Sequence, residues 1–189
     1  MKRMFLFVDV QKDFMNPNGS LYVPMSYNII PTLQKISKLS FDEHDKDPEN
    51  VEIAFTQDCH LKTDAEFISN GGQFPEHCMK GNDGAKSIIN NPEFKGTIYT
   101  KRCTDIFDSK LGSKKFKKLI KENFFNEVWV SGVVTEICVN HAVMGIKKIS
   151  PATEIYVFEN AIMHLDERAK EETFKTWISN GIHIAHCGL

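Results

Sequence analysis

The sequence has no long apolar run and almost no net charge, and these two absences exclude several classes of protein. Its 189 residues carry a formal net charge of −2, so charge makes no general case for nucleic acid or an anionic membrane as a partner. No apolar stretch is long enough to span a bilayer. The apolar run at residues 4–8 is interrupted by Asp9 before a signal-peptide core could form. We therefore expect neither a membrane nor a nucleic-acid partner, while a homo-oligomer is allowed.

The sequence also lacks the cysteine pattern of a secreted protein. It has five cysteines, an odd number without secretory context: Cys59, Cys78, Cys103, Cys138 and Cys187. Reduced thiols in a cytoplasmic protein are the best interpretation. No internal repeat or low-complexity linker divides the chain. Its length suits one domain, residues 1–189, with a sizeable core.

What the sequence does contain is an alternation of short β-rich runs and helical patterns. Strands are expected at residues 4–8, 51–56, 96–100, 127–131, 154–158 and 183–185. Helices are expected at residues 28–39, 84–89, 113–122, 136–148 and 166–180. This alternation predicts an α/β fold, a three-layer α/β/α sandwich with a mostly parallel, about six-stranded Rossmann-like sheet. The acidic segment 41–50 reads as a surface insertion, and the irregular segment 57–82 is long enough to be functional.

Cys138 is the most informative single residue. An apolar β-rich run ends at Gly132, the thiol follows six residues later, and a helical pattern then begins. We expect the cysteine near a helix start, beyond the carboxyl end of a strand, where the positive helix end stabilises a thiolate. Ligands bind at that edge of α/β folds. A buried, inert core cysteine is the alternative, and placement alone does not decide between the two.

Polar residues also follow other predicted strands. Asp9 ends an apolar strand, where a carboxylate is costly to bury unless it has a partner. It could instead form the following turn, although Asp13 suits that role better. Lys101 is either a solvated surface cation or a cleft residue that stabilises both the Asp9 carboxylate and the Cys138 thiolate. His141, three residues after Cys138, offers an alternative Cys–His pair one turn inside the helix.

A candidate metal site lies in the irregular segment. Asp58 and His60 are two residues apart and can point to the same side of an extended chain. Carboxylate and imidazole together suit zinc, iron or manganese. His77 could add a third ligand, and Glu66, Asp64 or water a fourth. A hydrogen-bonded loop histidine is the alternative for His60.

Taken together, these residues resemble the isochorismatase-like cysteine hydrolases, and within them the nicotinamidase (pyrazinamidase) branch. The matching motifs span nearly the whole chain: VDVQKDF at 8–14, TQDCH at 56–60, FPEHC at 74–78, Lys101, and GVVTEICV at 132–139. The resemblance implies a catalytic triad and a set of metal ligands. The triad is Asp9, Lys101 and Cys138, and the ligands, for Zn²⁺ first and Fe²⁺ or Mn²⁺ otherwise, are Asp58, His60 and His77.

The resemblance also implies how a substrate is held. A cis peptide between Val133 and Val134 would help aim the N–H groups of Val134 and Cys138 at an oxyanion. Phe14 would pack on a pyridine ring, and Phe74 would form an aromatic wall. Val133 would contact the substrate as well.

The implied reaction is hydrolysis of nicotinamide to nicotinate and ammonia through a cysteine thioester, in NAD salvage. Two departures from the family pattern leave the substrate open: Cys59 replaces a tryptophan, and RCTDIF follows at positions 102–107. A related amidohydrolase acting on another small amide or carbamoyl compound is the enzymatic alternative. A non-catalytic, redox-responsive binding protein is the alternative from another class.

Overall fold

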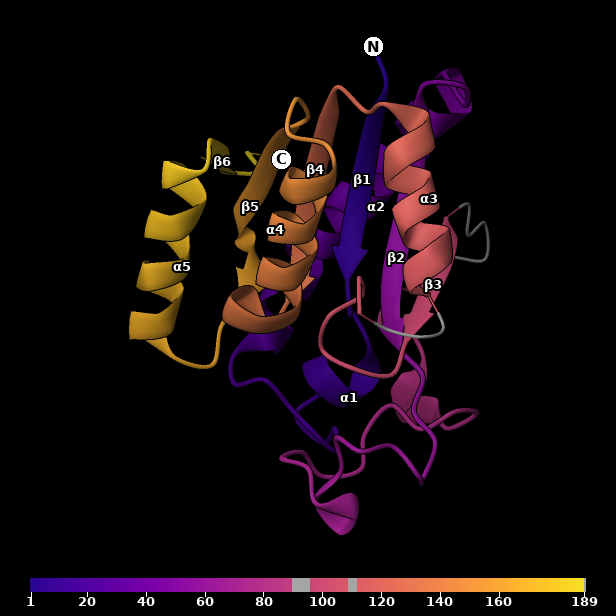
Figure 1. The fold of residues 1–189 in the computed structure, drawn as a ribbon, viewed down its shortest axis with the longest axis vertical. Coiled ribbons are helices and arrows are strands. Elements are labelled where there is room, and N and C mark those ends of the chain that lie inside the picture. The colour runs from indigo at the N-terminus through magenta and orange to yellow at the C-terminus, as the bar shows by residue number, and fades with distance from the viewer. Residues whose placement is uncertain (90–95, 109–111, 189) are drawn as a thin grey trace.

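A six-stranded sheet organises the computed structural model, which describes residues 1–89, 96–108 and 112–188 (Figure 1). The strands are β1 (Arg3–Val8), β2 (Val51–Asp58), β3 (Thr97–Lys101), β4 (Glu127–Val133), β5 (Glu154–Met163) and β6 (Ile182–Ala185). Their order is β3-β2-β1-β4-β5-β6, and every neighbouring pair is parallel. The predicted parallel α/β sheet is confirmed.

Helices cover both faces of the sheet. The helices are α1 (Lys12–Met15), α2 (Ile30–Lys46), α3 (Ser113–Asn123), α4 (Asn140–Ile149) and α5 (Glu167–Ser179). Short turns are η1 (Ser26–Ile29), η2 (Ile68–Asn70), η3 (Asp83–Ala85) and the π-helical η4 (Thr135–Val139). In Figure 1, α3, α4 and α5 lie in front of the sheet and α2 lies behind it. This is the expected three-layer sandwich.

The core forms on both sides of the sheet because side chains alternate along each strand. On β1, Met4 and Leu6 belong to the cluster beneath α3, α4 and α5, whereas Phe5 and Phe7 belong to the cluster beneath α2. Phe7 stacks on Phe55 of β2 with ring centroids 4.7 Å apart. Each fully buried side chain of this size contributes about 1.5–3 kcal/mol through apolar burial. The central strands therefore form a rigid base for the loops at their ends.

Two sequence predictions are wrong. Residues 41–46 are not an insertion, because α2 continues to Lys46 and buries Phe41 on its inner face. The helix predicted at 84–89 is only the turn η3. There the chain runs beside the segment after β1, since Ile88 N–H donates to the Val10 carbonyl and Lys12 N–H to the Lys86 carbonyl. Those main-chain bonds to another segment replace the bonds of a helix.

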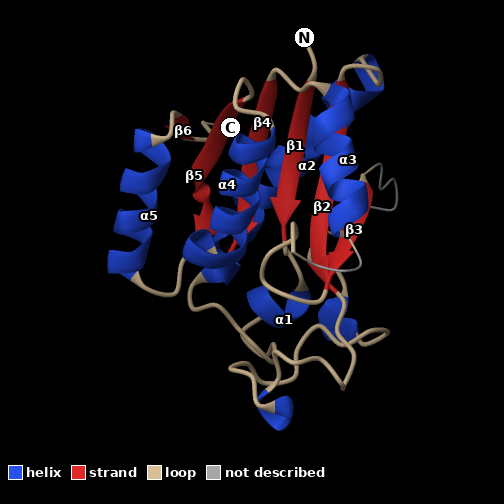
Figure 2. Cartoon of the chain, in the orientation of Figure 1, coloured by secondary structure: helices blue, strands red, loops and turns tan. Residues whose placement is uncertain are grey.

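The loops that follow β1, β2, β3 and β4 gather at one edge of the sheet, below it in Figure 2. The segment from Cys59 to Asn82 is mostly irregular, as expected, and contains only η2 as a short turn. Within the described ranges, no helix combines the length and the apolar character needed to cross a membrane.

Candidate active site

The register of the sheet brings the predicted polar residues together. Val8 pairs with Thr56 on β2 and with Gly132 on β4, so Asp9 emerges between those two strands. Asp58 and Lys101 are direct register partners on β2 and β3. Strands β2 and β3 follow on one side of β1, whereas β5 and β6 follow on the far side of β4. The strand order therefore reverses between β1 and β4, and parallel α/β sheets bind ligands at such a switch point.

Lys101 is the centre of a buried charge cluster and not a surface cation, since its side chain is only 1% exposed. Its Nζ lies 2.9 Å from Asp9 Oδ2 and 2.6 Å from Asp58 Oδ1. Cys138 Sγ lies 3.6 Å from the same Nζ. Asp9 also accepts a 2.8 Å hydrogen bond from the Thr56 hydroxyl. One ammonium group thus links the two carboxylates to the thiol.

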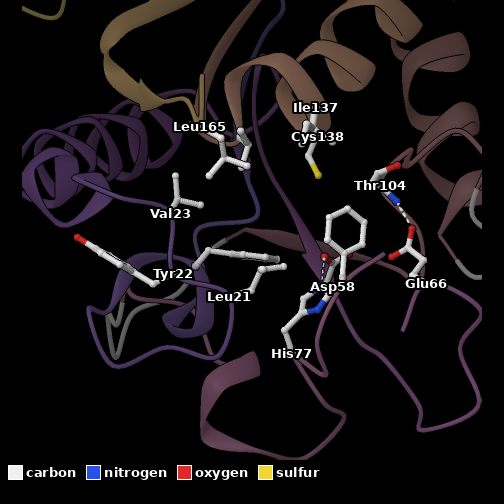
Figure 3. Close-up of a pocket in the computed structure, with 13 residues that line it drawn as sticks. Leu21, Tyr22, Val23, Asp58, Glu66, His77, Thr104, Ile137, Cys138 and Leu165 are labelled. Atoms are coloured by element: carbon white, nitrogen blue, oxygen red, sulfur yellow. Dashed lines mark hydrogen bonds and ion pairs between the residues drawn. The ribbon is translucent and has the colours of Figure 1, made fainter. Parts of the chain in front are cut away.

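Cys138 is the fourth residue of η4, and its sulfur points into a pocket (Figure 3). The structure brings Cys138 beside Lys101, whose Nζ lies 3.6 Å from the sulfur. His141, the alternative partner, lies half-exposed with its Nδ1 3.8 Å from Asp105. The Asp9–Lys101–Cys138 arrangement is therefore the one that the geometry favours.

Burial and the neighbouring buried charges together set the proton affinities of this cluster. Burial raises the pKa of Asp9, because the opposing attraction of Lys101 is smaller. Burial and the Asp9 and Asp58 carboxylates raise the pKa of the Cys138 thiol well above its usual value, although Lys101 opposes them. For Lys101, burial is outweighed by the two carboxylates, which raise its pKa. Burial and the two carboxylates therefore act against a thiolate at Cys138, while the Lys101 ammonium beside it acts in favour of one.

The three predicted metal ligands also converge. Donor atoms of Asp58, His60 and His77 all lie within 4.8 Å of one another, and all three residues are buried. Each histidine Nε2 is 3.6 Å from Asp58 Oδ2. Burial is opposed by Lys101 and by both histidines, which together hold the pKa of Asp58 below its usual value. An ionised carboxylate facing two imidazole nitrogens is a donor set that suits zinc.

A buried orphan atom supports a cation at this place. Within the described residues, His60 Nε2 has no hydrogen-bond partner although it is fully buried. Its other ring nitrogen, Nδ1, donates to Asp64 Oδ2 at 2.8 Å, and His77 Nδ1 donates to the Pro75 carbonyl at 2.8 Å. The Nε2 atoms of His60 and His77 therefore carry free lone pairs that face Asp58. A buried polar atom without a partner is costly, and a bound cation would satisfy it.

The structure distinguishes between Asp64 and Glu66, the two residues considered as a fourth metal ligand. The Asp64 carboxylate already accepts bonds from His60 and from the Leu61 N–H, and it pairs with both Nε and Nη2 of Arg102. It therefore supports a ligand and does not face the cluster. Glu66 does face it, with Oε2 3.8 Å from His60 Nε2. Its Oε1 accepts the Thr104 N–H at 2.9 Å.

The pocket that joins these groups is mainly apolar. Its lining residues are Phe14, Leu21, Tyr22, Val23, Asp58, Glu66, Phe74, His77, Thr104, Val134, Ile137, Cys138 and Leu165. Figure 3 shows the Cys138 sulfur on one side and Asp58 and His77 on another, with Leu165 and Val23 across from them. Phe14 and Phe74 are aromatic side chains of this lining. The Val133–Val134 peptide is cis; Val134 lines the pocket, while Val133 is buried in the core behind it.

Sequence reasoning missed three residues that hold the site in place. The Gln11 amide bonds both the N–H and the carbonyl of Asp58, at 2.7 and 2.8 Å. The Thr56 hydroxyl orients Asp9. Phe67 is fully buried against the rings of both metal-site histidines. Gln11 and Thr56 lie inside matching motifs, but the motifs do not reveal their partners, which are 47 residues away. No local pattern marks Phe67.

The chain belongs to the isochorismatase family, because its sequence matches the Isochorismatase domain over residues 3–185. It therefore has an isochorismatase-like hydrolase fold. A sequence comparison with curated proteins finds no match.

Solved structures with the same fold include a pyrazinamidase and a nicotinamidase. The pyrazinamidase of Pyrococcus horikoshii, in complex with zinc, is 25% identical with a TM-score of 0.85; the match covers 99% of this chain and 100% of that one. PnC1 from L. infantum, in complex with nicotinate, is 20% identical with a TM-score of 0.81 over 98% of this chain and 92% of its own. A Bacillus subtilis nicotinamidase is 19% identical with a TM-score of 0.78 over 98% and 100%. The last two likenesses bear on the fold alone.

Proposed function

We propose that this protein is a metal-dependent nicotinamidase, which hydrolyses nicotinamide to nicotinate and ammonia in NAD salvage. One observation carries the proposal: the pocket holding the Cys138 thiol is the same pocket that Asp58 and His77 of the candidate metal site line. A nucleophile and a group that can coordinate a ring nitrogen thus face one small apolar space. The similarity to the zinc-bound pyrazinamidase of Pyrococcus horikoshii supports this combination. The five unpaired cysteines suit a cytoplasmic enzyme.

Asp9, Lys101 and Cys138 carry the chemistry. Asp9 takes the thiol proton while the sulfur attacks the carboxamide carbon, and its raised pKa suits it to hold that proton. The N–H groups of Val134 and Cys138 receive the oxyanion, a contribution worth about 2.7–4 kcal/mol for one such donor in other enzymes. Asp9 then gives the proton to the departing ammonia. Water, deprotonated by Asp9, hydrolyses the remaining thioester to the acid and the free thiol.

Lys101 keeps this cycle electrically balanced. It neutralises Asp9 in the resting site and stabilises negative charge on sulfur as the proton leaves, since both atoms are within 3.6 Å of its Nζ. Asp58, His60 and His77 would hold the divalent ion, zinc first and iron or manganese otherwise. When bound, the ion supplies a Lewis acid that orients the substrate ring. Phe14 and Phe74 sandwich that ring.

A second candidate is a cysteine amidohydrolase for another small amide or carbamoyl compound. Glu66 favours it, because its side chain adds a second carboxyl group to the lining of the pocket, besides that of Asp58. Burial, and next Asp58, raise its pKa. A substrate substituent that exchanges hydrogen bonds with Glu66 would gain affinity that nicotinamide lacks.

The test is an ammonia-release assay on nicotinamide, pyrazinamide and a panel of aliphatic amides and carbamoyl compounds, with metal content measured on the same reduced sample. Preference for the pyridine and pyrazine carboxamides supports a nicotinamidase, and activity confined to carbamoyl compounds supports the second candidate. Cys138→Ala abolishes turnover, while Cys187→Ala, a buried cysteine outside the pocket, retains it. Wild-type turnover by Cys138→Ala would exclude the thioester mechanism.

A further inference from the structure

The two metal-site histidines are oriented by different kinds of acceptor. His77 Nδ1 donates to a main-chain carbonyl, that of Pro75, at 2.8 Å. His60 Nδ1 donates to a side chain, that of Asp64, also at 2.8 Å. In both cases the bond fixes the tautomer, so that Nε2 carries the free lone pair. For His60, this orientation depends on one carboxylate.

Asp64 is itself held by a converging set of donors. Its side chain is 4% exposed. Oδ2 accepts the Leu61 N–H at 3.0 Å and Arg102 Nε at 2.9 Å, besides His60. Arg102 Nη2 donates to Oδ1, which completes a two-pronged pair. Asn70 ties the main chain of the same turn, because its side-chain amide donates to the carbonyls of Asp64 and Lys62.

These contacts connect the protein surface to the candidate metal site through three residues in series. Arg102 is partly exposed, Asp64 is buried, and His60 is fully buried with Nε2 3.6 Å from Asp58. A buried carboxylate needs a compensating charge, and the Arg102 guanidinium provides it. The carboxylate in turn raises the basicity of the ring nitrogen on the far side of His60, as carboxylates behind ligating histidines do.

We infer that Asp64, held by Arg102, is a positioning residue that sets the metal affinity of the site through His60. This inference rests on the metal site of the proposed function. It concerns a residue that does not touch the pocket, since Asp64 is absent from its lining. Within the described residues, Asp64 forms no hydrogen bond or ion pair with Asp9, Lys101 or Cys138. The inference therefore separates metal retention from thiol chemistry.

The experiment titrates Zn²⁺ alone into chelator-stripped protein, in competition with a chromophoric chelator. Asp64→Asn keeps the shape but places an amide N–H₂ group against a histidine or an arginine donor, and it should lower Zn²⁺ affinity about 10- to 100-fold. Arg102→Met leaves the Asp64–His60 bond in place and should produce a smaller loss. Glu154→Gln is the matched control, because it alters another carboxylate–histidine pair, with exposed His183 at 2.7 Å, and should bind Zn²⁺ like the wild type.

Two further readouts separate positioning from general damage. Iodoacetamide should alkylate Cys138 of stripped Asp64→Asn at the wild-type rate. The stripped variant should still unfold in one cooperative transition, at a melting temperature lowered by the lost ion pair with Arg102. Wild-type Zn²⁺ affinity in both Asp64→Asn and Arg102→Met would overturn the inference. So would faster alkylation of Cys138 in stripped Asp64→Asn, which would mean that the whole site had loosened. If the wild type binds no Zn²⁺, the proposed metal site itself fails; if it binds Zn²⁺ and the variants do too, only the role of Asp64 fails.

Discussion

Lys101 Nζ lies closer to Asp58, at 2.6 Å, than to Asp9, at 2.9 Å. The cation that supports the candidate nucleophile is therefore also bound to a candidate metal ligand. The two oxygens of Asp58 have separate partners: Oδ1 contacts Lys101, and Oδ2 faces His60 and His77. The thiol chemistry and the metal site thus share one carboxylate and one ammonium group.

Replacing Lys101 with methionine tests this shared position. The change leaves two buried carboxylates without their cation, which should lower the free energy of unfolding by about 3–5 kcal/mol. It should also reduce kcat by about 10²-fold or more, because nothing then balances the charge on sulfur. Urea unfolding and ammonia release measure the two effects. Lys118→Met, which removes an exposed partner of Glu122, should change neither, and equal effects of both substitutions would contradict the assignment.

The pH dependence should report the proton affinity of Asp9. Because its pKa is raised in the folded protein, kcat/KM should rise with pH through an apparent pKa above 3.8, the usual value for this group. Thr56→Val removes a hydrogen bond to the ionised form, so the acid limb should move up by about one pH unit. Thr56→Ser, which keeps the hydroxyl, should leave the profile in place. A downward shift in Thr56→Val would contradict this role of the hydroxyl.

Changing His60 to alanine should chiefly weaken substrate binding. The thiol and its partners do not touch this ring, so kcat should fall less than KM rises for nicotinamide. Bound zinc should fall as well. Initial-rate kinetics with metal analysis test this, using His183→Ala, an exposed histidine outside the pocket, as the control. Unchanged KM together with unchanged zinc content would show that His60 is not a ligand.

Gly132 should resist substitution. Its φ is +123°, and an added Cβ would lie 2.0 Å from the Val8 carbonyl oxygen of the neighbouring strand. Gly132→Ala should therefore cost about 2 kcal/mol or more and shift the start of the segment that carries Cys138. Gly188→Ala is the control, since nothing lies within 4 Å of its added Cβ. Equal melting temperatures for the two variants would contradict the close approach of β1 and β4.

The predictable parts of the molecule are those that depend on local pattern. Each strand of the sheet was visible as an apolar run, and the residues after four of them could be expected at one edge because parallel strands share it. The helix expected at 84–89 failed because its residues bond the segment after β1, a pairing between distant parts of the chain. The same reason hid Thr56, whose partner Asp9 lies 47 residues away.

The protonation state of the candidate nucleophile was also beyond sequence reasoning. A cysteine near a helix start and beside a lysine suggests a thiolate. The structure adds burial and two nearby carboxylates, which raise the pKa of Cys138, while Lys101 opposes them. The outcome depends on the balance of these opposing effects, and only their geometry determines that balance.

The unequal support of the two histidines has a consequence for how the site tolerates genetic change. A single codon change can delete the acceptor behind His60, because that acceptor is the side chain of Asp64. No codon change deletes the acceptor behind His77, because every residue at position 75 supplies a carbonyl oxygen. A substitution at Asp64 can therefore disturb the ligand His60 indirectly. His77 is disturbed only by a substitution of His77 itself or by a change in the conformation of its loop.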